Sequence, residues 1–91
     1  MKVRFTNDFF LQYKRANVRI RNKTDESLRI FKRNLNDSQL KNHKLKREWA
    51  GHRSINITAD FRAIYKETKL ADEIIVYFVA LGTHKQLYKR K

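Results

Sequence analysis

The chain has 91 residues, of which 22 are Lys or Arg and 9 are Asp or Glu, so its formal net charge is +13. This length fits one small domain spanning residues 1–91 and rules out an enzyme with two separate cores. A positive surplus of this size is best explained by a polyanionic partner. Nucleic acid is the commonest such partner, and a membrane surface is the weaker candidate.

Several classes of site and location are excluded by what the sequence lacks. It has no cysteine, so disulfides and thiolate metal sites are impossible. No apolar stretch approaches the roughly 20 residues that span a bilayer, and the N-terminus is too charged for a signal peptide. A glycine-rich phosphate loop and an acidic metal cluster are also absent. We therefore predict a cytoplasmic protein with no membrane partner, no metal and no cofactor.

The first half of the chain has the pattern of a short strand followed by two helices. Val3 and Phe5 alternate with polar residues, as in a strand with one exposed face, and Asn7 is suited to cap the next helix. Asn17 either interrupts that helix or caps a second one. The apolar stripe of the second helix follows steps of three or four residues through Ile20, Thr24, Leu28, Phe31 and Leu35.

The second half has the period of two that is typical of strands. Residues 53–57 alternate between a core face and a polar face after a turn at Gly51, and a short interval at 58–60 leads into a second alternating run. These two runs predict an antiparallel hairpin. Residues 74–81 are all apolar, as in a central strand covered on both faces. Together the elements predict an α+β fold, with two N-terminal helices packed on a mostly antiparallel sheet of about four strands.

Histidine is the side chain that most readily exchanges protons near neutral pH, and the chain has three. His84 follows the buried strand, at a strand end of the kind where functional side chains concentrate, so we favour a functional role for it. His43 lies in a basic stretch that suits phosphate binding, with an exposed basic loop as the alternative. His52 follows Gly51 and fits a turn residue better.

Two further polar residues lie near the predicted hairpin. Asp60 occupies its corner, where on its own it would be a turn residue. Arg62 points to the opposite face from Phe61, so it shares the polar face with Asn56 if the two strands pair in suitable register. A concave polar face would then result.

Three blocks of sequence carry a family resemblance: His-Lys-Leu at 43–45, Ser-Ile-Asn-Ile-Thr-Ala-Asp-Phe-Arg-Ala-Ile-Tyr at 54–65, and Leu-Gly-Thr-His-Lys-Gln-Leu-Tyr at 81–88. In order and spacing these blocks resemble the YafQ-like branch of the RelE superfamily of bacterial toxins. That branch consists of type II toxin-antitoxin mRNA interferases, which are ribosome-dependent endoribonucleases. The resemblance covers a little over half of the chain, and the first 39 residues match only in the order of their elements.

The resemblance implies roles for individual positions. It places His43, Asp60 and His84 on the catalytic positions of the branch and gives Arg62 a phosphate-stabilising role. The aromatic substrate contacts it implies are Phe61 and Tyr88. We expect phosphates of the ribosome and the messenger to be held by the cations Lys41, Lys44, Lys46, Arg47 and Arg53.

One position departs from the pattern of the branch. Where this chain has Asn56, the branch usually has a further histidine. An amide can hydrogen-bond to substrate but cannot exchange a proton near neutral pH.

RNA cleavage suits these residues because RNA carries its own nucleophile, the 2′-hydroxyl. Asp60 or His43 would remove or orient the hydroxyl proton, and His84 as imidazolium would protonate the leaving 5′-oxygen. The resemblance also implies the partners: messenger RNA in the ribosomal A site, the ribosome, and a cognate antitoxin with an acidic or partly disordered segment.

Two other functions stay open at this stage. A ParE-like toxin that poisons DNA gyrase shares this fold without an RNA-cutting site. A small basic RNA-binding module explains the charge equally well. The placement of His43, Asp60 and His84 favours the nuclease over both alternatives.

Overall fold

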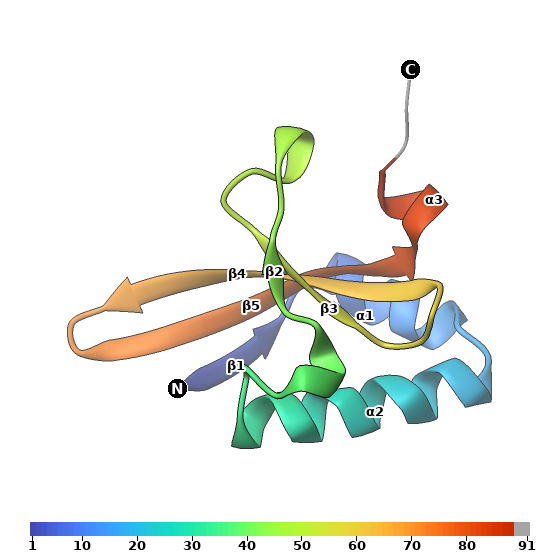
Figure 1. Cartoon of the computed structure of the whole chain (residues 1–91), viewed down its shortest axis with the longest axis horizontal. Coiled ribbons are helices and arrows are strands. Elements are labelled where there is room, and N and C mark those ends of the chain that lie inside the picture. Colours follow the sequence, from blue (N-terminus) through green and yellow to red (C-terminus); the bar gives the residue numbers. More distant parts are fainter. Residues whose placement is uncertain (89–91) are drawn as a thin grey trace.

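Five strands form one mixed sheet in the computed structural model, which describes residues 1–88 (Figure 1). They are β1 (Lys2–Phe5), β2 (His43–Lys44), β3 (Arg53–Asn56), β4 (Phe61–Leu70) and β5 (Glu73–Thr83). The order across the sheet is β1-β5-β4-β3-β2; β1 runs parallel to β5, and the other neighbours are antiparallel. The predicted α+β fold is confirmed. The sheet has one strand more than expected, because the two-residue β2 is too short to show a period.

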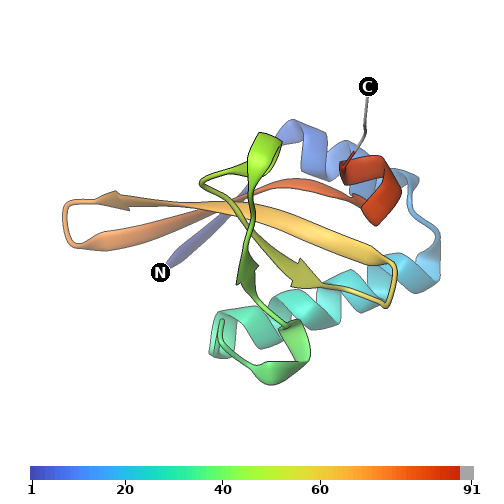
Figure 2. The same cartoon turned by 45° about the horizontal axis from the view of Figure 1, so that its top comes forward.

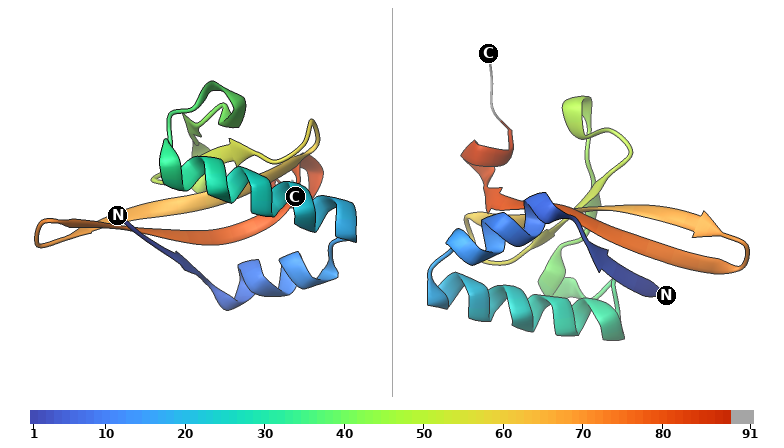
Figure 3. Two further views of the ribbon diagram at one scale, coloured as in Figure 1. Left: turned by 90° about the horizontal axis from the view of Figure 1, so that it is seen from below. Right: turned by 180° about the vertical axis from the view of Figure 1, so that it is seen from behind.

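Helices cover one face of this sheet. They are α1 (Asn7–Arg15) and α2 (Val18–Arg33), while α3 (His84–Leu87) follows β5 and two 3₁₀ turns, η1 (Ser38–Leu40) and η2 (Arg47–Trp49), flank β2. Figures 1 and 3 show α2 against one side of the sheet, with the η2 segment and α3 rising from the other. Figure 2 is tilted toward that second side, which we call the open face. No helix among residues 1–88 is long and apolar enough to cross a membrane.

The helix starts follow capping chemistry. Asn17 caps α2, because its side-chain oxygen accepts a 2.9 Å hydrogen bond from the Ile20 backbone N–H, as one of our two interpretations predicted. The prediction for α1 was wrong by one residue. Its cap is Thr6, whose hydroxyl accepts from the Phe9 N–H at 3.2 Å, and Asn7 is already helical.

The main core lies between the helices and the sheet. The ring of Phe31 meets Tyr65 and Phe78 edge-on, with centroid distances of 5.0 and 5.2 Å, and all three side chains are fully buried. Along the predicted stripe, Ile20, Thr24 and Phe31 are buried, and Leu28 and Leu35 are partly buried, with Leu35 just past the end of α2. A second, smaller cluster on the open face consists of Ile64, Ala80 and Leu87, with Leu45, Trp49, Val79 and Tyr88 packed against it.

The predicted central strand is an interior strand between β1 and β4, but the prediction that both of its faces are covered was wrong at its start. Ile74 is 41% and Tyr77 39% exposed. Ile74 lies in the part of the β4–β5 hairpin that extends beyond the rest of the sheet, where helices do not reach it (Figure 1). Tyr77 pairs with Arg4 of β1 and lies on the sheet face opposite the buried Val76 and Phe78, which helices do not cover. The polar face predicted for β3 was likewise wrong at Ser54, which is fully buried in the middle of the sheet.

Candidate functional site

A groove of about 400 Å³ lies on the open face, between the η2 segment and α3. Its lining residues are Lys44, Leu45, Lys46, Arg47, Glu48, His84 and Tyr88. Three cations therefore form one wall, and an imidazole and a phenol form the other. This composition suits a phosphate chain that carries flat bases.

Hydrogen bonds between residues close in sequence hold α3, which forms the groove wall with His84 and Tyr88. Thr83 and Gln86 form a capping box, in which the Thr83 hydroxyl accepts from the Gln86 N–H at 3.1 Å and the Gln86 side chain accepts from the Thr83 N–H at 2.8 Å. His84 and Tyr88 lie four residues apart on this short turn, with ring centroids 4.5 Å apart. Burial raises the pKa of the Tyr88 hydroxyl, an effect that Arg62 reduces and Glu48 increases.

Asp60 lies beside His84. Its backbone oxygen accepts a 3.2 Å hydrogen bond from the His84 N–H, so the turn between β3 and β4 abuts the start of α3. The predicted hairpin is confirmed, with Asp60 exposed at its corner. The backbone N–H of Asp60 donates to the hydroxyl of Thr58 at 3.3 Å, which fixes the turn.

Arg62 occupies the same face as Asn56, because the register pairs these two residues and continues to Gly82 on β5. The shared polar face that we predicted is therefore present. One guanidinium nitrogen, Nη1, donates to the carbonyl oxygens of Thr58, Ala59 and Phe61 at 2.9, 2.9 and 3.1 Å. Arg62 thus clamps the turn that carries Asp60.

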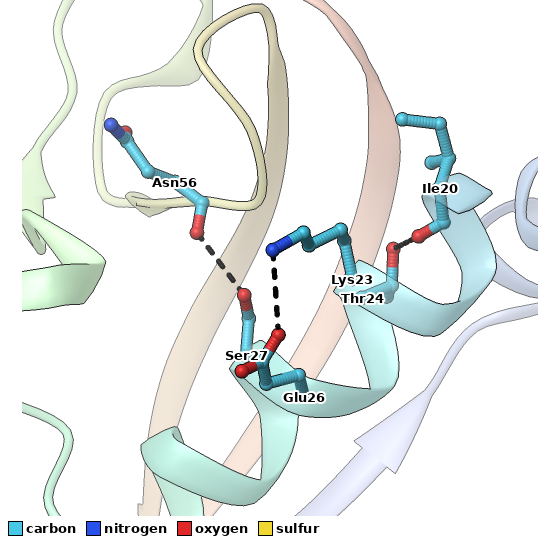
Figure 4. A network of polar contacts seen from close by, with 6 residues as sticks. All are labelled: Ile20, Lys23, Thr24, Glu26, Ser27 and Asn56. Carbon is cyan, nitrogen blue, oxygen red and sulfur yellow. Dashed lines mark hydrogen bonds and ion pairs between the residues drawn. The ribbon is translucent and has the colours of Figure 1, made fainter.

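The end of β3 is supported from below by α2. The Ser27 hydroxyl donates to the backbone oxygen of Asn56 at 3.4 Å, while the Asn56 side chain points away from the helix (Figure 4). On the same stretch of α2, Thr24 donates to the Ile20 carbonyl at 2.7 Å, and Lys23 pairs with Glu26 at 3.7 Å. The helix therefore holds the backbone of Asn56 and leaves its amide to the open face.

His43 lies farther from α3 than the other predicted catalytic residues. Residues paired across the sheet from β2 to β5 are His43, Ser54, Ile64 and Ala80, so His43 is on the open face. Three strand spacings separate β2 from β5, which is roughly 14 Å. The His43 side chain is exposed, and its neighbour in sequence, Lys44, lines the groove. The structure thus brings Asp60, Arg62, His84 and Tyr88 together and leaves His43 at the margin.

Two predicted binding residues face the helix side instead, because side chains alternate along a strand. Phe61 lines a separate cavity of about 280 Å³ together with Gln12 and Arg15. Arg53 donates from Nε to the side-chain oxygen of Asn42 at 2.8 Å. Lys41 is exposed in the turn before β2, outside the groove. These three positions are not placed with His84 and Tyr88.

Sequence reasoning missed Glu48 and Trp49. Among residues 1–88, Glu48 is the one carboxylate that lines the groove, and Trp49 underlies the groove through the smaller cluster. Neither belongs to the three sequence blocks, although both follow directly on the basic stretch that we noted. His52 lies in the expected turn, with its ring edge-on to Trp49 at 5.2 Å.

A further hollow, on the helix side, has the opposite character to the basic groove. This apolar groove of about 210 Å³ lies between β1, α1 and α2 and is lined by Phe5, Phe9, Phe10, Tyr13, Asp25 and Leu28. Phe5 is 44% and Phe10 53% exposed, which is high for phenylalanine. The ammonium of Lys14 lies 5.3 Å from the centroid of the Phe10 ring.

Comparison with known families decides the identity. The family model described as "Bacterial toxin of type II toxin-antitoxin system, YafQ" matches residues 1–89. The chain belongs to the YafQ toxin family. The predicted resemblance is therefore confirmed, and it extends over the N-terminal half. No curated protein matches the chain in sequence.

Solved structures share the YafQ fold along nearly the whole chain. YafQ from E. coli strain BL21(DE3) is 25% identical with a TM-score of 0.76, covering 96% of this chain and 97% of that one. A YoeB/ParE toxin from Agrobacterium tumefaciens is 26% identical with a TM-score of 0.73, covering 92% and 99%. The E. coli DinJ-YafQ complex is 26% identical with a TM-score of 0.64, covering 96% and 97%.

Proposed function

We propose that this YafQ-family toxin is a ribosome-dependent endoribonuclease that cuts messenger RNA in the A site and so stops translation in the cytoplasm. The observation that carries the proposal is the contact between His84 and Tyr88 on one wall of a groove whose other wall holds Lys44, Lys46 and Arg47. A proton donor, a stacking ring and phosphate-binding cations are the parts that RNA cleavage needs. The family match supports the same reading.

In the proposed reaction the 2′-hydroxyl of the substrate attacks the adjacent phosphorus. Asp60 or His43 takes or orients the hydroxyl proton, and His84 as imidazolium donates a proton to the 5′-oxygen as its bond to phosphorus breaks. Each such transfer contributes about 10²- to 10⁴-fold to the rate. Asp60 and His84 are joined through the backbone, so one substrate link is able to meet both.

Three further residues have supporting roles in this proposal: Arg62, Tyr88 and Asn56. The Nη1 atom of Arg62 holds the turn, and its Nε and Nη2 make no hydrogen bond within residues 1–88, so they are free for a phosphate oxygen. Tyr88 would stack on a base opened out of the messenger, at about 1–3 kcal/mol. Asn56 would donate a hydrogen bond beside Arg62.

We also propose an antitoxin partner that presents an acidic, amphipathic segment. The E. coli YafQ relative has been solved as a complex with DinJ. On this chain the net charge of +13 favours an acidic partner, and the apolar groove with exposed Phe5 and Phe10 offers its apolar side chains a place to bind.

The decisive experiment uses ribosomes programmed with a messenger that carries a single 2′-deoxy substitution at the cleaved nucleotide. We expect cutting to cease while binding is retained, because the nucleophile is missing. Continued cutting of the deoxy messenger would exclude this mechanism.

A gyrase-directed function is the second candidate, because one structural relative carries the double name YoeB/ParE. Brief induction in cells separates the two functions. The nuclease stops protein synthesis and yields new messenger ends in primer extension, whereas a gyrase poison triggers the DNA-damage response first.

A further inference from the structure

Asn42, which none of the roles above uses, makes three hydrogen bonds through one side chain. Its amide nitrogen donates to the backbone oxygen of Leu35 at 2.9 Å and to the hydroxyl of Tyr65 at 2.7 Å. Its amide oxygen accepts from Arg53 Nε at 2.8 Å. Asn42 therefore joins the loop after α2 to β3 and β4, just before β2 begins.

The partners of Asn42 are rigid. Tyr65 is fully buried, and its ring packs against Phe31 and Phe78 in the main core. Such a ring cannot shift without disturbing the core. Asn42 is thus anchored to the best-packed part of the molecule, while its two neighbours in sequence are exposed.

Those neighbours are Lys41 and His43, and they contact each other across Asn42. Lys41 has a left-handed backbone with φ of 47°, which is unusual for a residue with a side chain. Its carbonyl oxygen lies 2.8 Å from Nδ1 of His43. A carbonyl only accepts hydrogen bonds, so Nδ1 carries the proton, and the lone pair of the neutral imidazole is on Nε2.

We propose that Asn42 is a positioning residue for His43. By anchoring the chain between Lys41 and β2, it holds the Lys41 carbonyl against Nδ1 and keeps Nε2 of the neutral ring free to accept a proton. The catalytic consequence rests on the proposed function. In that function His43 is one of the two groups proposed to take or orient the 2′-hydroxyl proton, and the free lone pair on Nε2 is what allows it to accept that proton.

The test reads the tautomer directly, by ¹⁵N NMR of the histidine rings at a pH where they are neutral. His43 signals are assigned by the loss of one set in His43→Gln. We expect the Nδ1–H form of His43 in the native chain and a shift toward the Nε2–H form in Asn42→Ala. The matched control is Asn36→Ala, an exposed asparagine in the same loop, which should leave the tautomer unchanged.

A second variant covers the case in which Asn42→Ala does not fold. Tyr65→Phe keeps the buried ring and removes one of the hydrogen-bond partners of Asn42, so it should shift the tautomer in the same direction by a smaller amount. A native chain with the Nε2–H form, or a folded Asn42→Ala with an unchanged tautomer, overturns the proposal. A shift in both variants supports it.

Kinetics on programmed ribosomes separates this proposal from the proposed function. Asn42→Ala should lower kcat by about 10²-fold with little change in KM, because a proton transfer is impaired and not substrate binding. If the native chain cuts no RNA, the proposed function fails while the tautomer result still stands. If the chain cuts RNA and Asn42→Ala does so at the native rate, the positioning role is wrong.

Discussion

The indole nitrogen of Trp49 donates a 2.8 Å hydrogen bond to the backbone oxygen of Leu87. The two residues are 38 positions apart and belong to opposite walls of the basic groove, η2 and α3. Both side chains also pack in the smaller cluster on the open face. This bond therefore fixes the distance between the cations of the groove and His84.

Replacing Trp49 by Phe should widen the groove at a modest cost in stability. The ring still packs, but the partly buried oxygen of Leu87 loses its donor, which costs about 1 kcal/mol. We expect a matching fall in the free energy of unfolding in urea and weaker binding to single-stranded RNA. A variant with native stability and native affinity would show that the bond is not needed.

His84→Ala should reduce cleavage about 10²- to 10⁴-fold, since it removes the proposed acid. The side chain lies at the exposed start of α3, so the variant should keep the circular dichroism spectrum of the native chain. His52→Ala, in the turn beside Trp49, is the matched control and should retain most of the activity. A folded His84→Ala chain that still halts translation contradicts the assigned role.

The cations of the groove should set the salt dependence of RNA binding. Each phosphate contact on single strands contributes about 0.7 to the slope of log affinity against log salt. The double variant Lys46→Ala with Arg47→Ala should therefore flatten that slope by about 1.4. Lys66→Ala with Lys69→Ala, on the projecting hairpin, removes the same charge and should leave the slope nearly native. Equal effects of the two pairs would mean that net charge matters more than the groove.

Phe10→Glu should separate toxicity from neutralisation. The substitution places a carboxylate in the apolar groove on the helix side, away from His84, and repels an acidic partner. We expect cells to remain sensitive to this variant even when the cognate antitoxin is coexpressed. Lys14→Gln, which keeps the groove apolar, should remain largely neutralised. Full rescue of the Phe10→Glu strain by the antitoxin would place the interface elsewhere.

Tyr65 should make the fold sensitive to alkali. Burial raises the pKa of its hydroxyl above the ordinary tyrosine value, with smaller opposing effects of Asn42 and Arg53. The folded chain thus holds this proton more tightly than the unfolded chain, and the stability it contributes is complete below about pH 10 and is lost as pH rises further. Unfolding free energies of the native chain and Tyr65→Phe, measured from pH 8 to 11, should converge at the alkaline end. Parallel curves would contradict the shift.

Helices and strands were predicted best from the sequence where they are long enough for the spacing of apolar residues to repeat. The stripe of α2 extends over four turns, and the β3–β4 hairpin follows from two alternating runs. β2 has two residues and α3 has four, too few for any period. A signal for α3 was nevertheless present, since Thr83 and Gln86 have the spacing of a capping box.

The candidate site was predictable to a similar extent. Asp60, Arg62 and His84 lie together because one hairpin corner and one strand end meet at the same edge, which alternation and strand order suggest. Because side chains alternate between the two faces of the sheet, Phe61 and Arg53 lie on the other face. The family resemblance groups all these positions as one site and does not show this separation. The roles of Asn42 and Trp49 depend on contacts across 23 and 38 positions, which no local pattern contains.

The open face has its own small core, formed around Ile64, Ala80 and Leu87 and separate from the aromatic core under the helices. A region held by so few apolar contacts unfolds locally at a lower free-energy cost than the whole molecule. Gentle warming should therefore loosen η2 and α3, the two walls of the basic groove, while the larger core still resists hydrogen exchange.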